Sequence, residues 1–377
     1  MNETWWLDPS QLDDVQRQVL VQRPETDILI VGPPGSGKTN ILVLRANYVR
    51  SVAPRLLLVT FTRTLCEFLR SGPNIGRADQ VKRDEITTFM AWGRQFIRQH
   101  GVNVPEISND FNADRENTIR VIQEIIADQN PGKLYDVIFI DEVQDFRAEE
   151  LQILRRLARR VNAAGDSRQR IWNHNEGLPT VSGMVEKTLV LKEHYRIGAK
   201  ICDFADQILP PKFGEAALSE GCNYDEDGRP SSVRAVACTD FDNECSQCIA
   251  KIKEQRRYMT DEPIGVLFQL SDLRDAFWER LESDAELGPI SILQKQNDYK
   301  PFGPNSLIRV MTIASAKGSE FRAVHILGAE GFRTNRRELA FTGVTRAKTE
   351  VTLYHVAALE GHMTPPSDHL PELASIF

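Results

Sequence analysis

The strongest constraint on the fold of this chain is a glycine-rich loop at residues 32–39, which reads Gly-Pro-Pro-Gly-Ser-Gly-Lys-Thr. It fits the pattern G-x-x-x-x-G-K-S/T and lies between an apolar segment of strand character and one of helix character. In such a loop, successive backbone N–H groups surround phosphate oxygens, and the start of the helix adds its dipole. We therefore expect Lys38 to reach the β- and γ-phosphates of a nucleotide and the Thr39 hydroxyl to bind Mg²⁺. The other phosphate-binding residues that the pattern predicts are Gly32, Gly35, Ser36 and Gly37.

A second apolar segment ends in an acidic pair, within Ile-Phe-Ile-Asp-Glu-Val-Gln-Asp at 138–145. In open α/β sheets ligands bind at the carboxyl ends of the strands, where this pair would lie. We expect Asp141 to hold Mg²⁺, directly or through a water molecule. Glu142 follows the metal-binding position, so we expect it to be the general base for the attacking water. Together with the loop at 32–39, the pair predicts hydrolysis of ATP.

Apolar strands and amphipathic helices alternate along the chain, which predicts an α/β fold of mainly parallel sheets flanked by helices. A stretch rich in glycine and proline at 173–185 marks the expected domain boundary. We expect an N-terminal domain at 1–180, a C-terminal domain at 181–360 and a tail at 361–377. The expected strands are 27–31, 55–60, 85–88, 135–140 and 161–164 in the first domain, and 188–191, 232–238, 264–268, 290–293, 307–312, 323–327 and 351–355 in the second. The expected helices include 40–51, 88–100, 113–129, 149–160 and 241–258.

The arginine-rich segment 155–160 has two interpretations. Its arginines are expected to close the helix 149–160, whose first turn carries Glu149 and Glu150, since cations stabilise the C-terminal end of a helix. The alternative is a surface patch that binds nucleic acid.

The composition is that of an ordinary globular protein, with 41% hydrophobic and 26% charged residues among 377. No apolar run approaches the ~18 residues that a membrane span needs. The N-terminus lacks the basic and apolar regions of a secretory signal, so we expect a cytoplasmic protein. The formal net charge of -7 disfavours broad, nonspecific adhesion to nucleic acid. It is compatible with a narrow basic groove, and with a protein partner that contributes affinity.

Six cysteines are present, and Cys245 and Cys248 form the only C-x-x-C pair. Spacing of three places both on one face of the expected helix 241–258, so we expect buried structural thiols. A metal cluster of this pair with Cys222 and Cys238 is the alternative.

The pentapeptide Asp-Glu-Val-Gln-Asp at 141–145 resembles the D-E-x-Q-D element of UvrD/Rep-type superfamily-1 DNA helicases. Other elements of that family follow in order from about residue 12 to 355. The resemblance implies two RecA-like P-loop NTPase domains that close with ATP and relax after hydrolysis. It also implies that Gln16, in a segment similar to the family's glutamine motif, reads adenine. Gln169, in a segment similar to G-D-x-x-Q-S-I-Y, would sense the γ-phosphate.

Three segments of the second domain extend the resemblance. Residues 194–196 resemble N-Y-R, residues 312–321 resemble T-x-H-x-x-K-G-L-E-F, and residues 341–348 resemble V-A-x-T-R-A-K. Arginines in such segments suit a γ-phosphate because they stay charged and fork onto phosphate oxygens. The implied roles are adenine stacking for Tyr195, ribose binding for Glu320, and γ-phosphate contacts for Arg196 and Arg346.

Segments 59–62 and 86–89 are similar to elements of the family that touch single-stranded DNA. The implied nucleic-acid contacts, with RNA as an alternative to DNA, are Phe61, Thr62, Thr88, Phe89, Trp172 and Thr312.

The chain departs from the family pattern at the elements that face DNA or couple it to ATP. Met90 and Ala314 stand where the family has histidine, and Ser319 replaces a leucine. The family's accessory domains are reduced here to a small helical insertion at about 93–134 and a loop before 307–312. We therefore do not expect this chain to unwind duplex DNA efficiently unaided.

Two functions follow as hypotheses. The first is an ATP-dependent motor, a helicase or translocase core that binds single-stranded DNA. The second is a nucleotide-dependent regulatory subunit that senses DNA ends or ATP and switches a partner nuclease or effector, as small UvrD-like proteins of anti-phage systems do.

Overall fold

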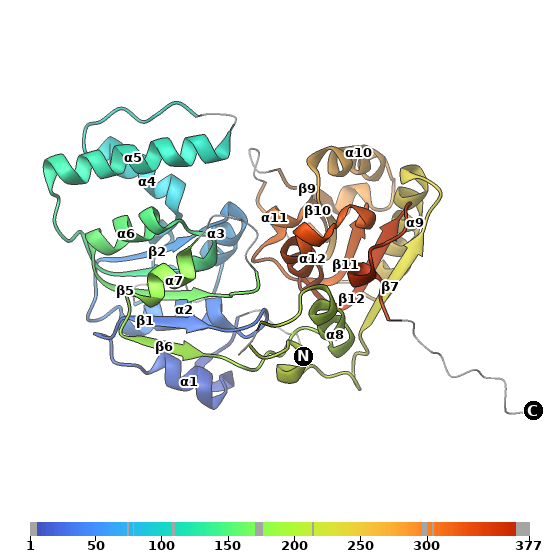
Figure 1. The fold of residues 1–377 in the computed structure, drawn as a ribbon, viewed down its shortest axis with the longest axis horizontal. Coiled ribbons are helices and arrows are strands. Elements are labelled where there is room, and N and C mark those ends of the chain that lie inside the picture. The colour runs from blue at the N-terminus through green and yellow to red at the C-terminus, as the bar shows by residue number, and fades with distance from the viewer. Residues whose placement is uncertain are drawn as a thin grey trace, which may run out of the picture. The chain divides into compact units, whose positions relative to one another are not determined.

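The computed structural model describes residues 6–73, 75–77, 79–107, 110–169, 176–212, 215–295, 300–303 and 305–366. The chain divides into two compact units (Figure 1). The first comprises Met1–Tyr195 together with Lys317–Ser319, and the second comprises Arg196–Ala316 together with Glu320–Phe377. Each contains a six-stranded parallel sheet flanked by helices, which confirms the predicted α/β fold of two RecA-like domains.

The first sheet has the strand order β3-β2-β4-β5-β1-β6, and every described pairing in it is parallel. Its strands are β1 (Ile28–Val31), β2 (Leu56–Thr60), β3 (Ile86–Thr88), β4 (Tyr135–Ile140), β5 (Ala158–Gly165) and β6 (Lys187–Val190). Its helices are α1 (Asp14–Leu20), α2 (Lys38–Val49), α3 (Arg63–Arg70), α4 (Phe89–Gln99), α5 (Phe111–Gln129), α6 (Ala148–Leu157) and α7 (Gly177–Ser182).

Both faces of this sheet are buried, because successive strand residues point to opposite sides. Ile28 and Ile30 belong to the apolar cluster that includes α2, whereas Leu29 belongs to the cluster that includes α4, α5 and α6. This explains why the strands read as continuous apolar runs.

The second sheet has the order β7-β12-β11-β8-β10-β9 and is likewise parallel. Its strands are β7 (Ser232–Ala237), β8 (Ile264–Phe268), β9 (Ser291–Leu293), β10 (Ile308–Thr312), β11 (Phe321–Leu327) and β12 (Ala347–His355). Its helices are α8 (Ala199–Ile208), α9 (Phe241–Arg256), α10 (Ser271–Glu282), α11 (Ile313–Ala316) and α12 (Arg337–Val344). Short 3₁₀ helices lie at Pro9–Gln11, Arg83–Glu85, Val143–Asp145, Ser219–Gly221, Gly288–Ile290, Ala329–Gly331, Thr334–Arg336 and Gly361–Met363. No helix in the described ranges combines the length and the apolarity that a membrane crossing requires.

The cysteine pair is buried as expected. Cys245 and Cys248 lie on α9 and are 0% exposed, and Cys238 shares their apolar cluster. Cys222 packs against a different cluster, in which α8 and α12 contribute. The alternative of one metal cluster containing Cys222 and the C-x-x-C pair is therefore wrong, since these thiols belong to separate parts of the core.

Two expected boundaries differ from the structure. The strand expected at 188–191 in the second domain is β6, which pairs with β1 of the first sheet, Ile28 opposite Lys187. The first unit therefore runs to Tyr195, beyond the expected boundary at 180. The pairing covers the edge of β1 that β5 leaves open, and the short helix α7 connects β5 to β6.

The expected helix 149–160 ends earlier, at Leu157, because β5 already begins at Ala158 opposite Tyr135 of β4. Arg159 therefore lies on a strand, 3.7 Å from an oxygen of Asp136, and does not close the helix. Only the arginines at 155 and 156 occupy the last turn of α6, where the expected interaction with the helix dipole applies.

The expected insertion at 93–134 is part of the domain core. Its helices α4 and α5 pack on one face of the sheet through Trp92, Phe96 and Ile122. An ion pair between Arg94 and Asp114, at 2.6 Å, also joins the two helices.

We predict that Gly177→Ala destabilises the first unit. A Cβ at Gly177 would lie 1.7 Å from the carbonyl oxygen of Val143, so the backbone would have to shift. We expect a loss of about 2 kcal/mol or more in the free energy of unfolding, measured by denaturant titration with circular dichroism. Gly361→Ala is the control, since a Cβ there meets nothing within 4 Å. Equal stability of the two variants would contradict the prediction.

Candidate nucleotide-binding site

The glycine-rich loop connects β1 to α2, and its form depends on a glycine at the start of the helix. Gly37 has φ of 81°, a left-handed conformation that favours glycine, and it is the N-cap of α2. Lys38 follows at the first helical position. Its Nζ donates to the carbonyls of Gly32 and Pro33, each at 2.8 Å, so the ammonium is held over the loop that the sequence predicts to bind phosphate.

The loop is tied to α1 by the residue expected to read adenine. Gln16 Nε2 donates to Ser36 O at 3.0 Å, and the Gln16 side-chain carbonyl accepts from Asp13 N at 3.1 Å. The Tyr195 hydroxyl donates to the Asp13 carboxylate at 2.8 Å. Gln16 and Tyr195 thus meet the same aspartate, and their contacts with adenine remain predictions.

Asp141 and Glu142 follow β4 at its carboxyl end, as the sequence predicts. Asp141 is 1% exposed, and its carboxyl shares a hydrogen bond with the Thr39 side chain. Burial and the charge of Glu142 raise the pKa of Asp141 to about 7, although the hydrogen bond from Thr39 and the charge of Lys38 oppose this. The two residues expected to bind Mg²⁺ are therefore brought together.

Three buried oxygens around the loop fit a phosphate and a cation. Ser36 Oγ, Asp141 Oδ2 and Asp166 Oδ2 have no hydrogen-bond partner among the described residues. Buried polar atoms of this kind are costly unless they meet a partner. A hydroxyl and two carboxylate oxygens next to Lys38 are suitable partners for a nucleotide with Mg²⁺.

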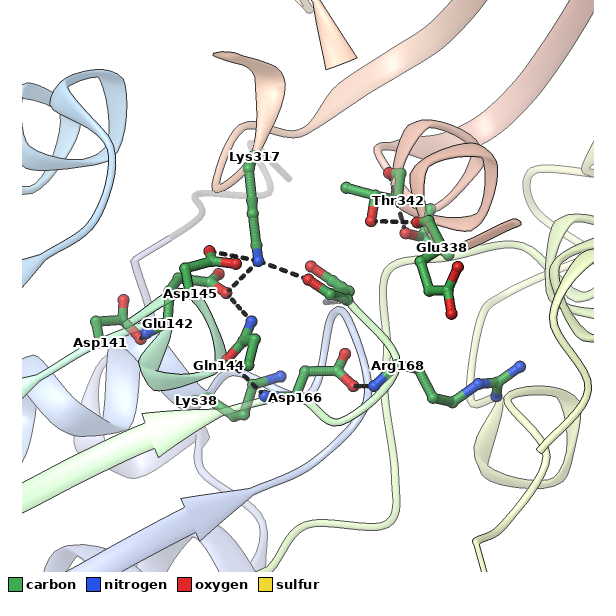
Figure 2. A network of polar contacts seen from close by, with 12 residues as sticks. Lys38, Asp141, Glu142, Gln144, Asp145, Asp166, Arg168, Lys317, Glu338 and Thr342 are labelled. Atoms are coloured by element: carbon green, nitrogen blue, oxygen red, sulfur yellow. Dashed lines mark hydrogen bonds and ion pairs between the residues drawn. The ribbon is translucent and has the colours of Figure 1, made fainter. Parts of the chain in front are cut away.

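Glu142 has an unusual backbone conformation. Its φ of 55° and ψ of 44° are left-handed, which is uncommon for a residue other than glycine, and it caps the 3₁₀ helix Val143–Asp145. Its carboxylate accepts a hydrogen bond from Gln144 Nε2 (Figure 2). Backbone strain of this kind concentrates at functional sites. The conformation is thus compatible with the expected role as general base.

The structure adds two residues to which the sequence assigned no role. Lys317 is 1% exposed, and its Nζ lies 2.5 Å from Asp145 Oδ2 and 3.6 Å from Glu142 Oε2 (Figure 2). The same ammonium donates to the backbone carbonyl of Gln169 at 2.7 Å. Burial raises the pKa of Asp145 to about 6, and Lys317 acts against this shift. The one signal in the sequence was that Lys317 and Asp145 both lie in motif-like segments. It did not indicate that the two side chains contact each other.

Gln169 lies just beyond the carboxyl end of β5, within a hydrogen-bonded chain of residues. Asp166 N donates to Gln144 Oε1 at 3.0 Å, and Arg168 N donates to Asp166 Oδ1 at 2.9 Å. Gln169 is 3% exposed, and sensing of the γ-phosphate by this residue remains a prediction. Trp172 lies outside the described residues.

The three residues of the second unit that are predicted to contact the nucleotide lie close together. Arg196 Nη1 donates to Glu320 Oε1 at 2.8 Å. Burial would raise the pKa of Glu320, but the charges of Arg196, Lys348 and Arg346 lower it below its ordinary value. Arg346 is 5% exposed, and its Nε donates to Thr342 O at 3.1 Å. Glu320 is therefore an ionised partner of arginine here, and its contact with ribose remains a prediction.

Most residues expected to contact nucleic acid lie at the ends of strands and begin helices. Thr62 caps α3 and Thr88 caps α4 through their side-chain oxygens. Thr312 Oγ1 accepts from Ser315 N at 3.3 Å in the second unit. Phe61 is partly exposed after β2. Contacts of these four residues with a nucleic-acid strand remain predictions.

Phe89 requires a correction. It is 2% exposed and packs against Trp92 and Phe146, with ring centroids 5.6 and 6.5 Å away. Its ring fills the core because it lies on the inner side of α4. The side chain is therefore not presented to a nucleic-acid strand.

Comparison with known proteins gives two matching domain families. Residues 307–354 match the UvrD-like helicase C-terminal domain, and residues 9–171 match the AAA ATPase domain. No curated protein sequence matches the chain.

Similar solved structures include the C-terminal domain of a possible DNA helicase from Lactobacillus plantarum WCFS1, at 20% identity and a TM-score of 0.34, covering 46% of this chain and 94% of that one. The PRRSV helicase is 16% identical with a TM-score of 0.43, covering 90% of this chain and 54% of its own. Arterivirus nonstructural protein 10, a helicase, is 18% identical with a TM-score of 0.43, covering 90% of this chain and 61% of its own. The present chain thus spans little more than half the length of the two viral proteins.

The fold and the loop between β1 and α2 define a P-loop ATPase with two RecA-like domains. The two domain matches confirm the resemblance to UvrD/Rep-type superfamily-1 helicases seen in the sequence motifs, through residues 307–354 for the UvrD-like domain and residues 9–171 for the ATPase domain.

We predict that Lys317→Met lowers the free energy of unfolding by about 3 kcal/mol or more, because it leaves the buried Asp145 carboxylate without its cation. Asp145 has a raised pKa of about 6, so it takes up a proton in the folded state as pH falls through that value. In Lys317→Met the pKa of Asp145 rises further, because the ammonium that lowers it is lost, so the cost of the unpaired charge is present above that higher pKa and is relieved by protonation as pH falls. The difference between wild type and variant should therefore be larger at pH 8 than at pH 5, measured by denaturant unfolding.

Lys295→Met is the matched control for this prediction. Lys295 pairs with Asp275 at 3.2 Å, but both side chains are about 40% exposed, at 42% and 40%. Such a surface pair contributes about 1 kcal/mol or less. An equal loss of stability in both variants would contradict the prediction.

Proposed function

We propose that this protein is an ATP-dependent nucleic-acid motor, the core of a UvrD-like helicase or translocase that binds single-stranded DNA. The observation that carries the proposal is a group of three buried oxygens around Lys38, Ser36 Oγ, Asp141 Oδ2 and Asp166 Oδ2, which have no hydrogen-bond partner in the part of the chain that the structure describes. The number and chemistry of these oxygens suit a nucleoside triphosphate with Mg²⁺. A cytoplasmic location is part of the same proposal.

In the proposed reaction each residue has a distinct task. Thr39 and Asp141 would hold Mg²⁺, which neutralises charge on the β- and γ-phosphate oxygens. Glu142 accepts a proton from the attacking water, and Gln169 positions the γ-phosphate. Arg196 and Arg346, which the resemblance assigns to the γ-phosphate, stabilise the charge that spreads over it during transfer.

Single-stranded DNA would contact Phe61, Thr62, Thr88 and Thr312 in this proposal. We expect DNA to raise the turnover of ATP, because a motor couples the two activities. The decisive experiment is steady-state ATP turnover with and without single-stranded DNA and single-stranded RNA. If neither strand changed turnover, the motor would be ruled out.

The regulatory subunit is the second candidate, and the packing of the small insertion favours it. The helices α4 and α5 belong to the core of the first unit and do not form a separate strand-separating domain. Assembly with a nuclease or effector that requires ATP, without movement along DNA, would support this candidate over the motor.

We predict that Lys38→Ala abolishes ATP turnover, since its ammonium is the cation held over the phosphate loop. Turnover would be measured by phosphate release. Lys187→Ala is the control, because Lys187 is exposed on β6 and contacts Gln22 only through its ammonium at 3.0 Å. Normal turnover in Lys38→Ala would exclude the assigned site.

We predict that Arg346→Ala slows hydrolysis about a hundredfold or more while ATP binding changes little, because a cation at the γ-phosphate acts mainly on the transition state. Binding of a fluorescent ATP analogue and kcat would be measured together. Arg333→Ala, at an exposed position, is the matched control. An unchanged kcat would remove Arg346 from the reaction.

A further inference from the structure

A buried arginine of the small insertion connects the acidic segment after β4 with an aromatic side chain after β2. Arg115 lies on α5 and is 2% exposed. Its Nε donates to Glu150 Oε1 at 2.6 Å, and its Nη2 contacts the other oxygen of the same carboxylate. That Nη2 also donates to the backbone carbonyl of Asp145 at 3.0 Å. The guanidinium lies over the ring of Phe61, with Cζ 5.1 Å from the ring centroid.

These contacts use the whole guanidinium group. Its fork binds the Glu150 carboxylate, one arm reaches the Asp145 carbonyl, and its plane faces the Phe61 ring. A lysine would offer one ammonium in place of the planar fork, so it could not make all three contacts. A buried ion pair adds little net stability compared with apolar residues of the same volume. The buried ion pair is therefore weak evidence that Arg115 serves stability.

The Phe61 end of this connection is partly exposed and held in place. Phe61 meets Phe111 and Phe146 edge to face, with ring centroids 6.3 and 5.8 Å away. Phe146 is 0% exposed and directly follows Asp145 in the chain. The Phe61 ring thus contacts this segment in two ways, through Arg115 and through Phe146.

The Asp145 end reaches the expected general base. The Asp145 carboxylate lies 2.5 Å from Lys317 Nζ, and the same Nζ lies 3.6 Å from Glu142 Oε2. Asp145 N also donates to Glu142 O at 3.0 Å. The backbone that Arg115 holds is therefore the backbone that places Glu142.

We propose that Arg115 is a positioning residue that couples a nucleic-acid base on Phe61 to ATP hydrolysis at Glu142. The proposal rests on the proposed motor function, because it takes Phe61 as a base contact. A base stacked on Phe61 shifts the ring, Arg115 follows its π face, and the Asp145 carbonyl moves with the guanidinium. Arg115 itself touches neither nucleotide nor strand.

The test is Arg115→Lys in the full chain, compared with wild type and Arg120→Lys. Three quantities are measured: kcat for ATP with saturating single-stranded oligothymidine, kcat without it, and the Kd of labelled oligothymidine by fluorescence anisotropy. We expect the ratio of stimulated to basal kcat to fall roughly 2- to 30-fold in Arg115→Lys, the range seen for residues that carry coupling. The Kd should change less than about twofold, because Arg115 is buried.

Arg120→Lys is the matched control, because Arg120 lies on the same helix but its side chain is 62% exposed and pairs with Glu124 at 2.8 Å. It should behave as wild type. If Arg115→Lys fails to fold, the double variant Arg115→Met/Glu150→Met replaces it, since it leaves neither charge unpaired in the core. The same loss of stimulation is expected there, while thermal unfolding reports any purely structural effect.

Equal stimulation in wild type and in the folded Arg115 variant would overturn the proposal and leave the motor function intact. A lower melting temperature with an unchanged ratio would do the same, because it would assign Arg115 to stability alone. Absence of stimulation in the wild-type chain would overturn the motor function and this proposal together.

Discussion

The burial of several carboxylates beside the carboxyl edge of the first sheet is the constraint on which the site depends. A buried carboxylate is costly unless a cation or an N–H donor meets it. Asp145 meets Lys317, Glu150 meets Arg115, and Asp141 is bonded to Glu142 N at 3.0 Å. Satisfying these charges brings segments distant in sequence to one place. The same requirement keeps Asp141 Oδ2, which has no partner among the described residues, suited to a cation.

Strain and close approach concentrate in the turn that follows β4. Glu142 adopts a left-handed conformation, and Gly177 approaches the carbonyl of Val143 so closely that no side chain fits. Each feature restricts the residues that the chain can accept at that position. Both keep the turn in one conformation, so that the Glu142 carboxylate is presented in a fixed direction. A rigid turn also transmits small displacements from its neighbours.

The strands were largely predictable because both faces of each sheet are covered and the strands are therefore apolar throughout. The expected segments 135–140 and 264–268 coincide with β4 and β8. The expectation was wrong at the start of β5, which is fixed by strand pairing. This strand begins at Ala158 because Ala158 lies opposite Tyr135 of β4, and the periodicity of a sequence does not show which strands pair. Phe89 was likewise misassigned. Its segment resembles one that touches single-stranded DNA, but its ring faces the protein core.

By itself, the sequence determined the nucleotide loop, the acidic pair after β4 and the ATPase class, because these depend on neighbouring residues and on backbone conformation. Only the tertiary structure decided which charges meet. Lys317 reaches the carbonyl of Gln169 across 148 residues, and Arg115 reaches Glu150 across 35. Such pairs arise because separate segments must fill and neutralise one buried volume. No local pattern records this, so the residues that surround the expected general base appeared only in the folded chain.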